Sequence, residues 1–213
     1  MLTVHHLGIS QSDRVIWLCE ELEIPYQLEI YQRLPDSRRA PPQYKGLHRA
    51  GTAPVITDGE VVLAESGAIL EYIDAMYGEE RLSVKKTEPG FADYLHWLHF
   101  SGSSLMATGA VLMMVREGDL KRTVSLVDTM QIREDDQYDW VESWLTGHRF
   151  FAANRFTVAD IMMFFPLATM RMNTARSLDP FPSIKAYLRR IIARPAYLRA
   201  LKRGDPDLEP LVV

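Results

Sequence analysis

One stretch in the first half of the chain organises the rest of it. Residues 51–66 are Gly51-Thr52-Ala53-Pro54-Val55-Ile56-Thr57-Asp58-Gly59-Glu60-Val61-Val62-Leu63-Ala64-Glu65-Ser66. Pro54 opens an apolar run and should begin a strand, since proline cannot donate to the hydrogen-bond ladder inside one. Asp58-Gly59 stands between two β-rich runs and predicts a hairpin. Glu65-Ser66 then places a carboxylate and a hydroxyl beside a helix start, where free N–H groups bind anions. A plain strand–turn–strand–helix joint with a serine cap would give the same pattern.

The residues before this stretch predict a βαβ unit. Residues 2–7 partly alternate in polarity and predict a strand. A helix is expected after two candidate caps, Ser12 and Asp13. Residues 26–31 alternate again, so the two strands should be parallel with a right-handed connection. With the hairpin and a helix at 66–77, four strands with helices on both faces make a domain of about 80 residues.

The rest of the chain predicts an all-helical domain. Residues 80–90 are polar and predict a linker, and no convincing strand follows it. Apolar residues instead recur at three- and four-residue spacing. The expected helices are 91–116, 121–145, 183–193 and 197–202.

A further helix has its own start signal. Thr157-Val158-Ala159-Asp160 matches the capping-box pattern ahead of an apolar run. The segment after it, Ile161–Leu167, is apolar all round, so it should be buried on most sides. Pro166 should kink it. We therefore expect this helix at the centre of the helical domain.

Composition limits the function classes. The chain has 213 residues, of which 47% are hydrophobic and 24% charged, as in ordinary globular proteins. Its net charge of −4 argues against general nucleic-acid binding, which needs a basic surface. The single cysteine, Cys19, excludes an internal disulfide and favours a reducing compartment. The N-terminus shows no signal-peptide pattern, and the longest apolar stretch, Ile161–Met170, is shorter than the ~20 residues of a membrane span. We expect a soluble cytoplasmic protein without a membrane partner.

Five motifs follow one another along the chain. They are Ser10-Gln11-Ser12-Asp13-Arg14-Val15, Ala53-Pro54-Val55, Glu65-Ser66, Thr157–Asp160, and His96-Trp97-Leu98-His99-Phe100 with Ser104-Leu105-Met106. Together they resemble motifs of the cytosolic glutathione transferases. The first resembles the serine loop and helix start of the theta, phi and zeta-like classes, the second the family's cis-proline turn, Glu65-Ser66 its Glu/Gln-Ser pair, and Thr157–Asp160 the capping box of its buried helix. The segment that begins at His96 is similar to bacterial and fungal members. The resemblance spans nearly the whole chain.

The resemblance implies a fold and an activity. The fold would be α/β plus all-α: a thioredoxin-like βαβαββα domain at 1–79, a linker at 80–90 and an all-helical domain at 91–213. The protein would be a detoxifying homodimer that conjugates the glutathione thiolate to apolar electrophiles, with glutathione as co-substrate and no metal. The alternatives are a glutathione-dependent disulfide reductase or peroxidase, and a non-enzymatic binding protein on the same fold.

Ser10 is the catalytic residue that the resemblance implies. A free thiol has a pKa near ~8.5, so little of it is thiolate at neutral pH. A hydrogen bond to a charged group contributes about 1.5–3 kcal/mol, which lowers a thiol pKa by about one to two units. Ser10 would therefore stabilise the thiolate, aided by the dipole of the following helix. Ser12 is the rival, although a helix cap is the simpler role for it.

The remaining glutathione contacts follow from the same motifs. Ala53 would pair its backbone with the cysteinyl part of glutathione at a cis peptide bond to Pro54. Glu65 would take the γ-glutamyl ammonium and Ser66 the adjacent carboxylate. Many family members carry a lysine where this chain has Thr52, so another cation must meet the glycyl carboxylate. The candidates are His48, Arg38, Arg39 and Lys45, and His48 is favoured because it lies closest to the turn in sequence.

Several reactive side chains are given structural roles instead. Cys19 lies on the apolar face of its helix and should be core. His5 and His6 fall within a strand and lack partners at ligand spacing, so no metal site is expected. Asp160 should be a capping residue. Three methionines could line an apolar pocket, but helix core is the simpler expectation for them; they are Met106, Met113 and Met114.

Overall fold

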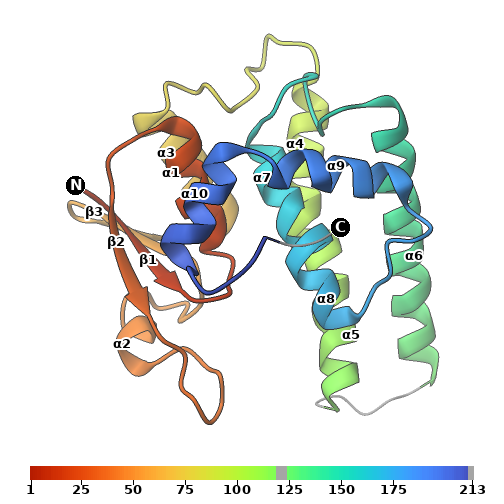
Figure 1. The fold of residues 1–213 in the computed structure, drawn as a ribbon, viewed down its shortest axis with the longest axis horizontal. Coiled ribbons are helices and arrows are strands. Elements are labelled where there is room, and N and C mark those ends of the chain that lie inside the picture. Colours follow the sequence, from red (N-terminus) through yellow and green to blue (C-terminus); the bar gives the residue numbers. More distant parts are fainter. Residues whose placement is uncertain (119–123, 211–213) are drawn as a thin grey trace. The chain divides into compact units, whose positions relative to one another are not determined.

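A computed structural model gives the structure of the chain and describes residues 1–118 and 124–210 (Figure 1). The chain forms two compact units. The first unit contains residues 1–83 together with 192–210, and the second contains residues 84–191. The predicted arrangement, a thioredoxin-like domain followed by a helical domain, is confirmed.

The first unit is built on a four-stranded sheet with the order β2-β1-β3-β4. Its strands are β1 (Leu2–Leu7), β2 (Gln27–Tyr31), β3 (Val55–Asp58) and β4 (Val61–Ala64). β1 runs parallel to β2, as the βαβ prediction requires, and antiparallel to β3. The hairpin was predicted to turn at Asp58-Gly59, but Asp58 is still paired with Val61. The turn residues are therefore Gly59 and Glu60, and Gly59 has a φ of 59°, which glycine adopts readily.

Helices cover both faces of this sheet (Figure 1). They are α1 (Asp13–Leu22), α2 (Pro42–Lys45) and α3 (Ser66–Tyr77). α1 and α3 pack against each other. On the opposite face, Tyr44 of α2 packs with Leu7, Val55 and Ala64. Cys19 of α1 is fully buried and burial raises the pKa of its thiol, so its predicted core role is confirmed.

The last helix, α10 (Pro195–Gly204), packs against α1 within the first unit. We expected one helical domain over 91–213, whereas the compact units place residues 192–210 with the sheet. The reason is an apolar stripe of Ala196, Tyr197 and Ala200, which is buried. Arginines on the same helix also form ion pairs with α1, among them Arg199 with Glu20 at 2.9 Å.

The regular structure in the described residues of the second unit is helical, apart from an isolated β-bridge between Ala152 and Arg155. Its helices are α4 (Phe91–Phe100), α5 (Ala107–Glu117), α6 (Val124–Gly147), α7 (Val158–Phe165), α8 (Arg171–Thr174) and α9 (Pro182–Ile192). The predicted start of α6 at Lys121 lies outside the described residues. π-Helical turns link α4 to α5 (Ser101–Met106) and α7 to α8 (Pro166–Met170). The second turn opens at Pro166, where a kink is predicted, because proline has no N–H for the helical ladder.

α4 and α5 form one long apolar helix. Residues Phe91–Arg116 are long and apolar enough, by length and composition alone, to cross a membrane. This helix is longer than Ile161–Met170, the apolar stretch that was compared with a membrane span, although its apolar residues are interrupted by polar ones. In its most apolar window 44% of the residues are buried within the protein, and core helices of soluble proteins meet the same criterion. Met114 on this helix is 42% exposed, so it is not core.

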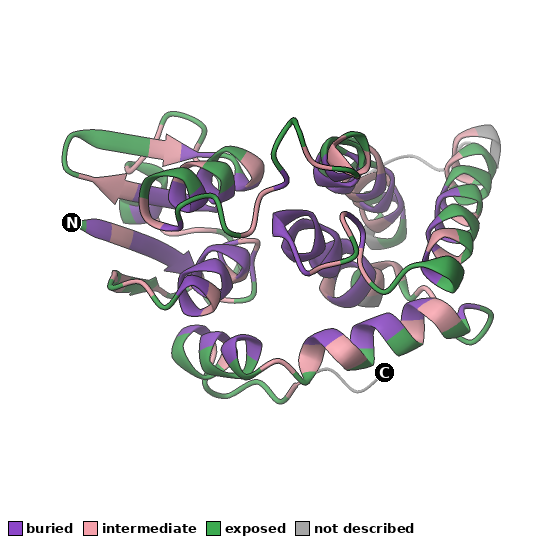
Figure 2. Ribbon diagram, turned by 90° about the horizontal axis from the view of Figure 1, so that it is seen from above, coloured by how far each residue is buried: buried purple, intermediate pink, exposed green. Residues whose placement is uncertain are grey.

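α7 is the buried helix that the capping box predicts (Figure 2). All of its side chains are buried, and both halves of the box between Thr157 and Asp160 are present. Asp160 accepts hydrogen bonds from the backbone N–H groups of Thr157 (2.8 Å) and Phe151 (3.1 Å) and from the Tyr187 hydroxyl (3.3 Å). Burial raises the pKa of Asp160 to about 7, and these donors act in the opposite direction. Its predicted role as a cap is confirmed.

Candidate functional site

Ser10 lies in the loop between β1 and α1, and its side chain is only 8% exposed. Its Oγ lies 2.7 Å from Ser12 Oγ and accepts a hydrogen bond from the Ser12 backbone N–H at 3.2 Å. Ser12 stands at the N-cap position of α1, but its side chain makes no cap hydrogen bond. The expected capping role of that side chain is therefore wrong, because its hydroxyl points to Ser10 and to β1 instead.

A buried histidine stands behind the two serines. His6 is fully buried, and its Nδ1 lies 2.9 Å from Ser12 Oγ. Its Nε2 lies 3.2 Å from Asp205 Oδ2, and Asp13 Oδ1 lies 3.7 Å from Nδ1. The expectation that this histidine lacks partners was wrong, because Asp205 reaches it from the far end of the sequence.

By distance alone this cluster could hold a cation. One ligand atom from each of His6, Asp13 and Asp205 lies within 4.8 Å of the others. The two ring nitrogens of His6 face different partners, however, and Nδ1 already contacts Ser12. We therefore interpret the cluster as hydrogen-bonded and electrostatic.

His5 belongs to different surroundings. Because side chains alternate along a strand, His5 points to the opposite face of the sheet from His6. Its ring nitrogens contact Tyr31 Oη at 3.2 Å and Thr57 Oγ1 at 3.1 Å. The two adjacent histidines are thus both buried, and only His6 contacts the Ser10–Ser12 pair.

Gln11 joins the Ser10 loop to the start of α3. Its Oε1 accepts a hydrogen bond from Ser66 Oγ at 3.2 Å and one from Arg14 Nη1 at 2.7 Å. Arg14 is 2% exposed, and burial lowers the pKa of its guanidinium to about 9. The Gln11 side chain therefore links two predicted site residues, because it contacts Ser66 and its backbone directly follows Ser10.

Glu65 has an unusual backbone. It precedes α3 with φ 78° and ψ 121°, a conformation that side-chain-bearing residues rarely adopt. Such strain persists only where the surroundings fix it, and it concentrates at ligand sites. The Glu65 side chain is exposed, whereas Ser66 is buried at the first position of the helix. A charged group is thus presented beside a helix N-terminus.

The Ala53–Pro54 peptide bond is cis, as the resemblance implies. Pro54 is buried and Thr52 is exposed. His48 lies before them in a turn, where its Nδ1 accepts a hydrogen bond from the Ala50 N–H at 3.1 Å. Its other ring nitrogen, Nε2, is then the one that can donate to an anion.

One supporting residue was not predicted. Arg33 donates from Nε to the Gly8 carbonyl at 2.8 Å and from Nη2 to the Ile9 carbonyl at 3.1 Å. Its Nη1 donates to the Arg38 carbonyl at 2.9 Å. Arg33 therefore fixes the backbone just before Ser10. No local pattern marks such a residue, because the carbonyls that it holds before Ser10 lie 24 and 25 positions away in sequence.

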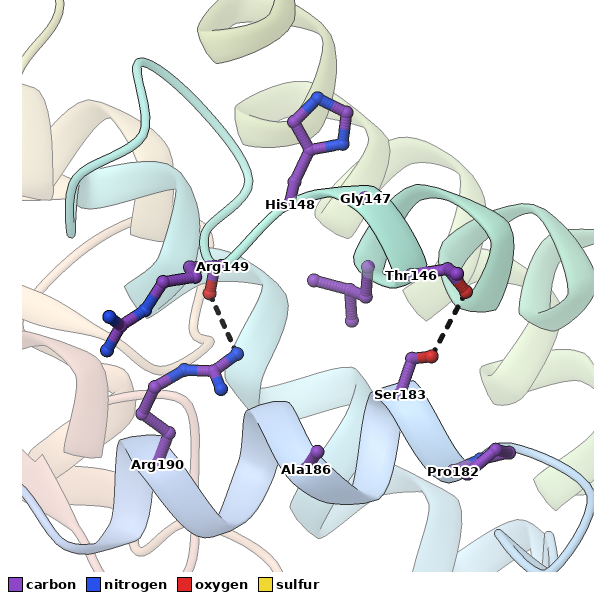
Figure 3. Close-up of a pocket in the computed structure, with 9 residues that line it drawn as sticks. Thr146, Gly147, His148, Arg149, Pro182, Ser183, Ala186 and Arg190 are labelled. Carbon is purple, nitrogen blue, oxygen red and sulfur yellow. Dashed lines mark hydrogen bonds between the residues drawn. The ribbon is translucent and has the colours of Figure 1, made fainter.

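A pocket of about 360 Å³ lies within the second unit (Figure 3). It is lined by α9 and by the end of α6 with the residues that follow it. Arg190 Nη2 donates to the Arg149 carbonyl at 3.0 Å, and Thr146 Oγ1 lies 3.1 Å from Ser183 Oγ. None of its lining residues is a predicted site residue, so it adds nothing to the candidate site.

Comparisons with known proteins agree with this architecture. A family model described as "Glutathione S-transferase, N-terminal domain" matches residues 10–76, and one described as "Glutathione S-transferase, C-terminal domain" matches residues 105–195. Glutathione S-transferase 3 of Schizosaccharomyces pombe is 32% identical over 97% of this chain and 89% of its own length.

Solved structures give the same result. The crystal structure of a glutathione S-transferase from Actinobacillus pleuropneumoniae superposes with a TM-score of 0.87 at 31% identity, covering 96% of this chain and 93% of that one. A glutathione transferase family member from Pseudomonas fluorescens, solved with two glutathione molecules bound, has a TM-score of 0.78 over 94% of this chain and 92% of that one. At 20% identity, that second likeness shows the fold alone.

Proposed function

Because the chain belongs to the glutathione S-transferase family, we propose that it binds glutathione in its first unit and transfers the thiolate to an apolar electrophile. The observation that carries this proposal is the link from Gln11 to Ser66. Ser66, which is proposed to bind the γ-glutamyl end of glutathione, contacts Gln11. Gln11 directly follows Ser10, which is proposed to meet the thiol. An extended tripeptide spans about 10 Å, so adjacent subsites suit its length.

Ser10 is the proposed thiolate stabiliser. Its hydroxyl would donate to the glutathione sulfur, and the positive end of α1, which begins at Asp13, would add to the effect. The thiol proton leaves to solvent, and the sulfur lone pair forms the new C–S bond. The displaced electron pair departs with the leaving group or, where the electrophile is an activated double bond, moves onto the neighbouring atoms, which take up a proton from solvent. Ser10 takes no part as a nucleophile or base.

The remaining contacts follow the peptide. Glu65 would pair with the γ-glutamyl ammonium, and Ser66 with its own N–H would bind the neighbouring carboxylate. Ala53 would hydrogen-bond the cysteinyl backbone beside Pro54, and Thr52 would line the same turn. His48 Nε2 is the proposed partner of the glycyl carboxylate, because the Ala50 N–H already occupies Nδ1.

Ser10→Ala tests this function. A hydrogen bond to a charged group contributes about 1.5–3 kcal/mol, so kcat/KM for a chloronitrobenzene should fall about 10- to 100-fold. The pKa of the bound thiol, followed by thiolate ultraviolet absorbance, should rise by about one to two units. The affinity for S-methylglutathione, which has no thiol, should not change. Ser103→Ala, at an exposed serine of the second unit, is the matched control.

The other outcomes separate the alternatives. Turnover of a mixed disulfide or a peroxide without conjugation would favour the reductase or peroxidase. Binding of immobilised glutathione without turnover would favour a non-enzymatic binding protein. The proposal is contradicted if the wild-type protein is not retained on immobilised glutathione and does not bind S-methylglutathione. We also propose a cytoplasmic, detoxifying homodimer, which fractionation and analytical ultracentrifugation would test.

A further inference from the structure

The Ser10 hydroxyl ends a buried chain of polar side chains. Ser10 Oγ lies 2.7 Å from Ser12 Oγ, which lies 2.9 Å from His6 Nδ1. On the far side of the ring, Nε2 lies 3.2 Å from Asp205 Oδ2, an ion-pair distance without hydrogen-bond alignment. His6 and Ser12 are fully buried. The chain therefore runs from the segment after α10, through β1, to the proposed thiol site.

The direction of these hydrogen bonds follows from counting donors and acceptors. A serine hydroxyl has one proton and two lone pairs. The Leu7 N–H donates to Ser12 Oγ at 3.2 Å and occupies one lone pair. If His6 Nδ1 carries a proton, it occupies the other. The Ser12 proton then goes to Ser10 Oγ at 2.7 Å, because its alternative acceptor, the Leu7 carbonyl, lies at 3.4 Å.

The same count fixes Ser10. Its Oγ already accepts from the Ser12 N–H at 3.2 Å, and the Ser12 hydroxyl fills its second lone pair. Its own proton must then point out of the cluster. If His6 Nδ1 were instead an acceptor, the Ser12 proton would turn to His6. The Ser10 proton would then turn inward to Ser12, and it would be lost to a thiolate.

Each ring nitrogen of His6 has a carboxylate oxygen near it. Asp205 faces Nε2, and Asp13 lies near Nδ1 on the Ser12 side. The other charged groups around the cluster are Arg14 of α1, which interacts with Asp13, and Arg33, which interacts with both carboxylates. A proton on Nδ1 would face acceptor oxygens, that of Ser12 at 2.9 Å and that of Asp13 at 3.7 Å.

Asp205 is itself held in place. Its two oxygens accept from the Ile9 N–H at 3.3 and 3.2 Å. Two glycines leave just enough room for the contact. A Cβ on Gly8 would lie 3.1 Å from Asp205 Oδ1, and a Cβ on Gly204 would lie 3.2 Å from His6 Nε2. The close approach of Asp205 to His6 therefore depends on backbone positions without side chains.

We propose that His6, paired with Asp205, is a positioning residue that turns the Ser10 hydroxyl proton outward, toward the sulfur of bound glutathione. The inference rests on the proposed function, since it assumes that Ser10 donates to the thiolate. Ser12 transmits the direction, and the close approach of Asp205 fixes the position of the His6 ring.

The test compares two adjacent buried histidines. His6→Leu removes the donor behind Ser12, whereas His5→Leu removes a histidine of similar burial on the other face of the sheet. One net hydrogen bond corresponds to about a two- to tenfold change in an equilibrium constant. His6→Leu should therefore raise the pKa of the bound glutathione thiol by about 0.3–1 unit and lower kcat/KM by about two- to tenfold. His5→Leu should leave both unchanged.

Two further measurements keep the test decisive. Affinity for S-methylglutathione should stay constant in His6→Leu, because that ligand has no thiol, which separates positioning from general damage. Ser12→Ala removes the hydroxyl that fixes Ser10 Oγ and leaves the Ser10 hydroxyl free to rotate, so the bound-thiol pKa should rise in the same direction, even if His6→Leu does not fold.

The outcomes distinguish this inference from the function it rests on. If Ser10→Ala raises the bound-thiol pKa while His6→Leu or Ser12→Ala folds and leaves it unchanged, the positioning role is overturned and the proposed function stands. If the wild-type bound-thiol pKa is not lowered, or Ser10→Ala does not raise it, both are overturned.

Discussion

Both units bury a cluster of hydroxyl and carboxylate groups, but they assemble these clusters in different ways. In the second unit, Thr157 and Asp160 are three residues apart and satisfy each other within one helical turn. In the first unit, His6, Ser12 and Asp205 come from three separate segments of the chain. The first kind of cluster forms with its helix, whereas the second requires the complete fold of its unit.

The clusters also differ in whether they leave a hydrogen-bond donor available to a ligand. The Asp160 oxygens accept from the backbone of Thr157 and Phe151 and from the Tyr187 hydroxyl, so their bonding is internal. In the cluster behind Ser10, a proton on His6 Nδ1 would leave the Ser10 proton directed outward. A closed cluster stabilises a fold, whereas one with an unused donor can also act on a ligand.

The largest effect is expected from breaking the closed cluster. Asp160→Ala leaves the buried backbone N–H groups of Thr157 and Phe151 without their acceptor, whereas the Tyr187 hydroxyl keeps the backbone carbonyl of residue 160 at 3.3 Å. Each buried unsatisfied group costs about 1–3 kcal/mol, so the free energy of unfolding should fall by about 3–5 kcal/mol. Urea denaturation followed by circular dichroism measures the loss, and hydrogen exchange should locate it in α7.

Thr157→Ser is the matched control for this change. It keeps the capping hydroxyl, so we expect less than about 1 kcal/mol of destabilisation. A loss below about 1 kcal/mol for Asp160→Ala would show that the cluster is not needed for stability.

A smaller effect is expected from crowding the open cluster at Gly204. In Gly204→Ala, the new Cβ would lie 2.9 Å from Ile16 Cδ1 and 3.2 Å from His6 Nε2. Overpacking costs about 1–3 kcal/mol, and the gain in helix propensity offsets up to about 1 kcal/mol of it. The bound-thiol pKa should rise as well, because the methyl group presses on the ring that faces Asp205.

Gly147→Ala is the control, since nothing lies within 4 Å of its added Cβ. It should be neutral or slightly stabilising. A Gly204→Ala variant with wild-type stability and an unchanged bound-thiol pKa would mean that this contact tolerates displacement and does not set the geometry of His6.

The smallest effect concerns the ion pairs that attach α10 to α1. Burial raises the pKa of Glu20, but hydrogen bonds from Arg199, Tyr26 and Arg203 outweigh it, so its pKa lies below the ordinary value. Both arginines are nearly half exposed, so Glu20→Gln should cost only about 1 kcal/mol at neutral pH.

The sign of the pH dependence follows from the lowered pKa. The Glu20 contribution is present above the ordinary pKa of 4.5 and is lost as the pH falls through the lower folded-state value. The difference in unfolding free energy between wild type and Glu20→Gln should therefore shrink below about pH 4.5. Urea titrations at neutral and acid pH measure it, and a constant difference would exclude an electrostatic origin.

The sequence predicts most of the fold because its signals are local. The strand β1, the hairpin, α3 and the Thr157 capping box follow from turn residues and periodicity within a few positions. The small misses are also local in origin. The hairpin turn moved by one residue because Asp58 keeps a strand partner in Val61, which a turn dipeptide does not reveal.

Only some residues of the candidate site can be predicted from local sequence signals. Ser10, Pro54 and Ser66 carry motif signals, whereas Arg33 and Asp205 do not. Arg33 acts on backbone carbonyls, and Asp205 lies 199 positions after His6 in the sequence. Alternation along β1 separates the faces of His5 and His6, but it does not tell which face Asp205 will reach.

The position of α10 bears on how the protein is made. The sheet and the helix that completes its unit are separated by the whole second unit, and ribosomes add about 5–20 residues per second. The first unit therefore lacks α10 and Asp205, which faces His6, while α4 to α9 are being synthesised. If glutathione binds as proposed, its thiol contact should be weak during translation until Asp205 has left the ribosome.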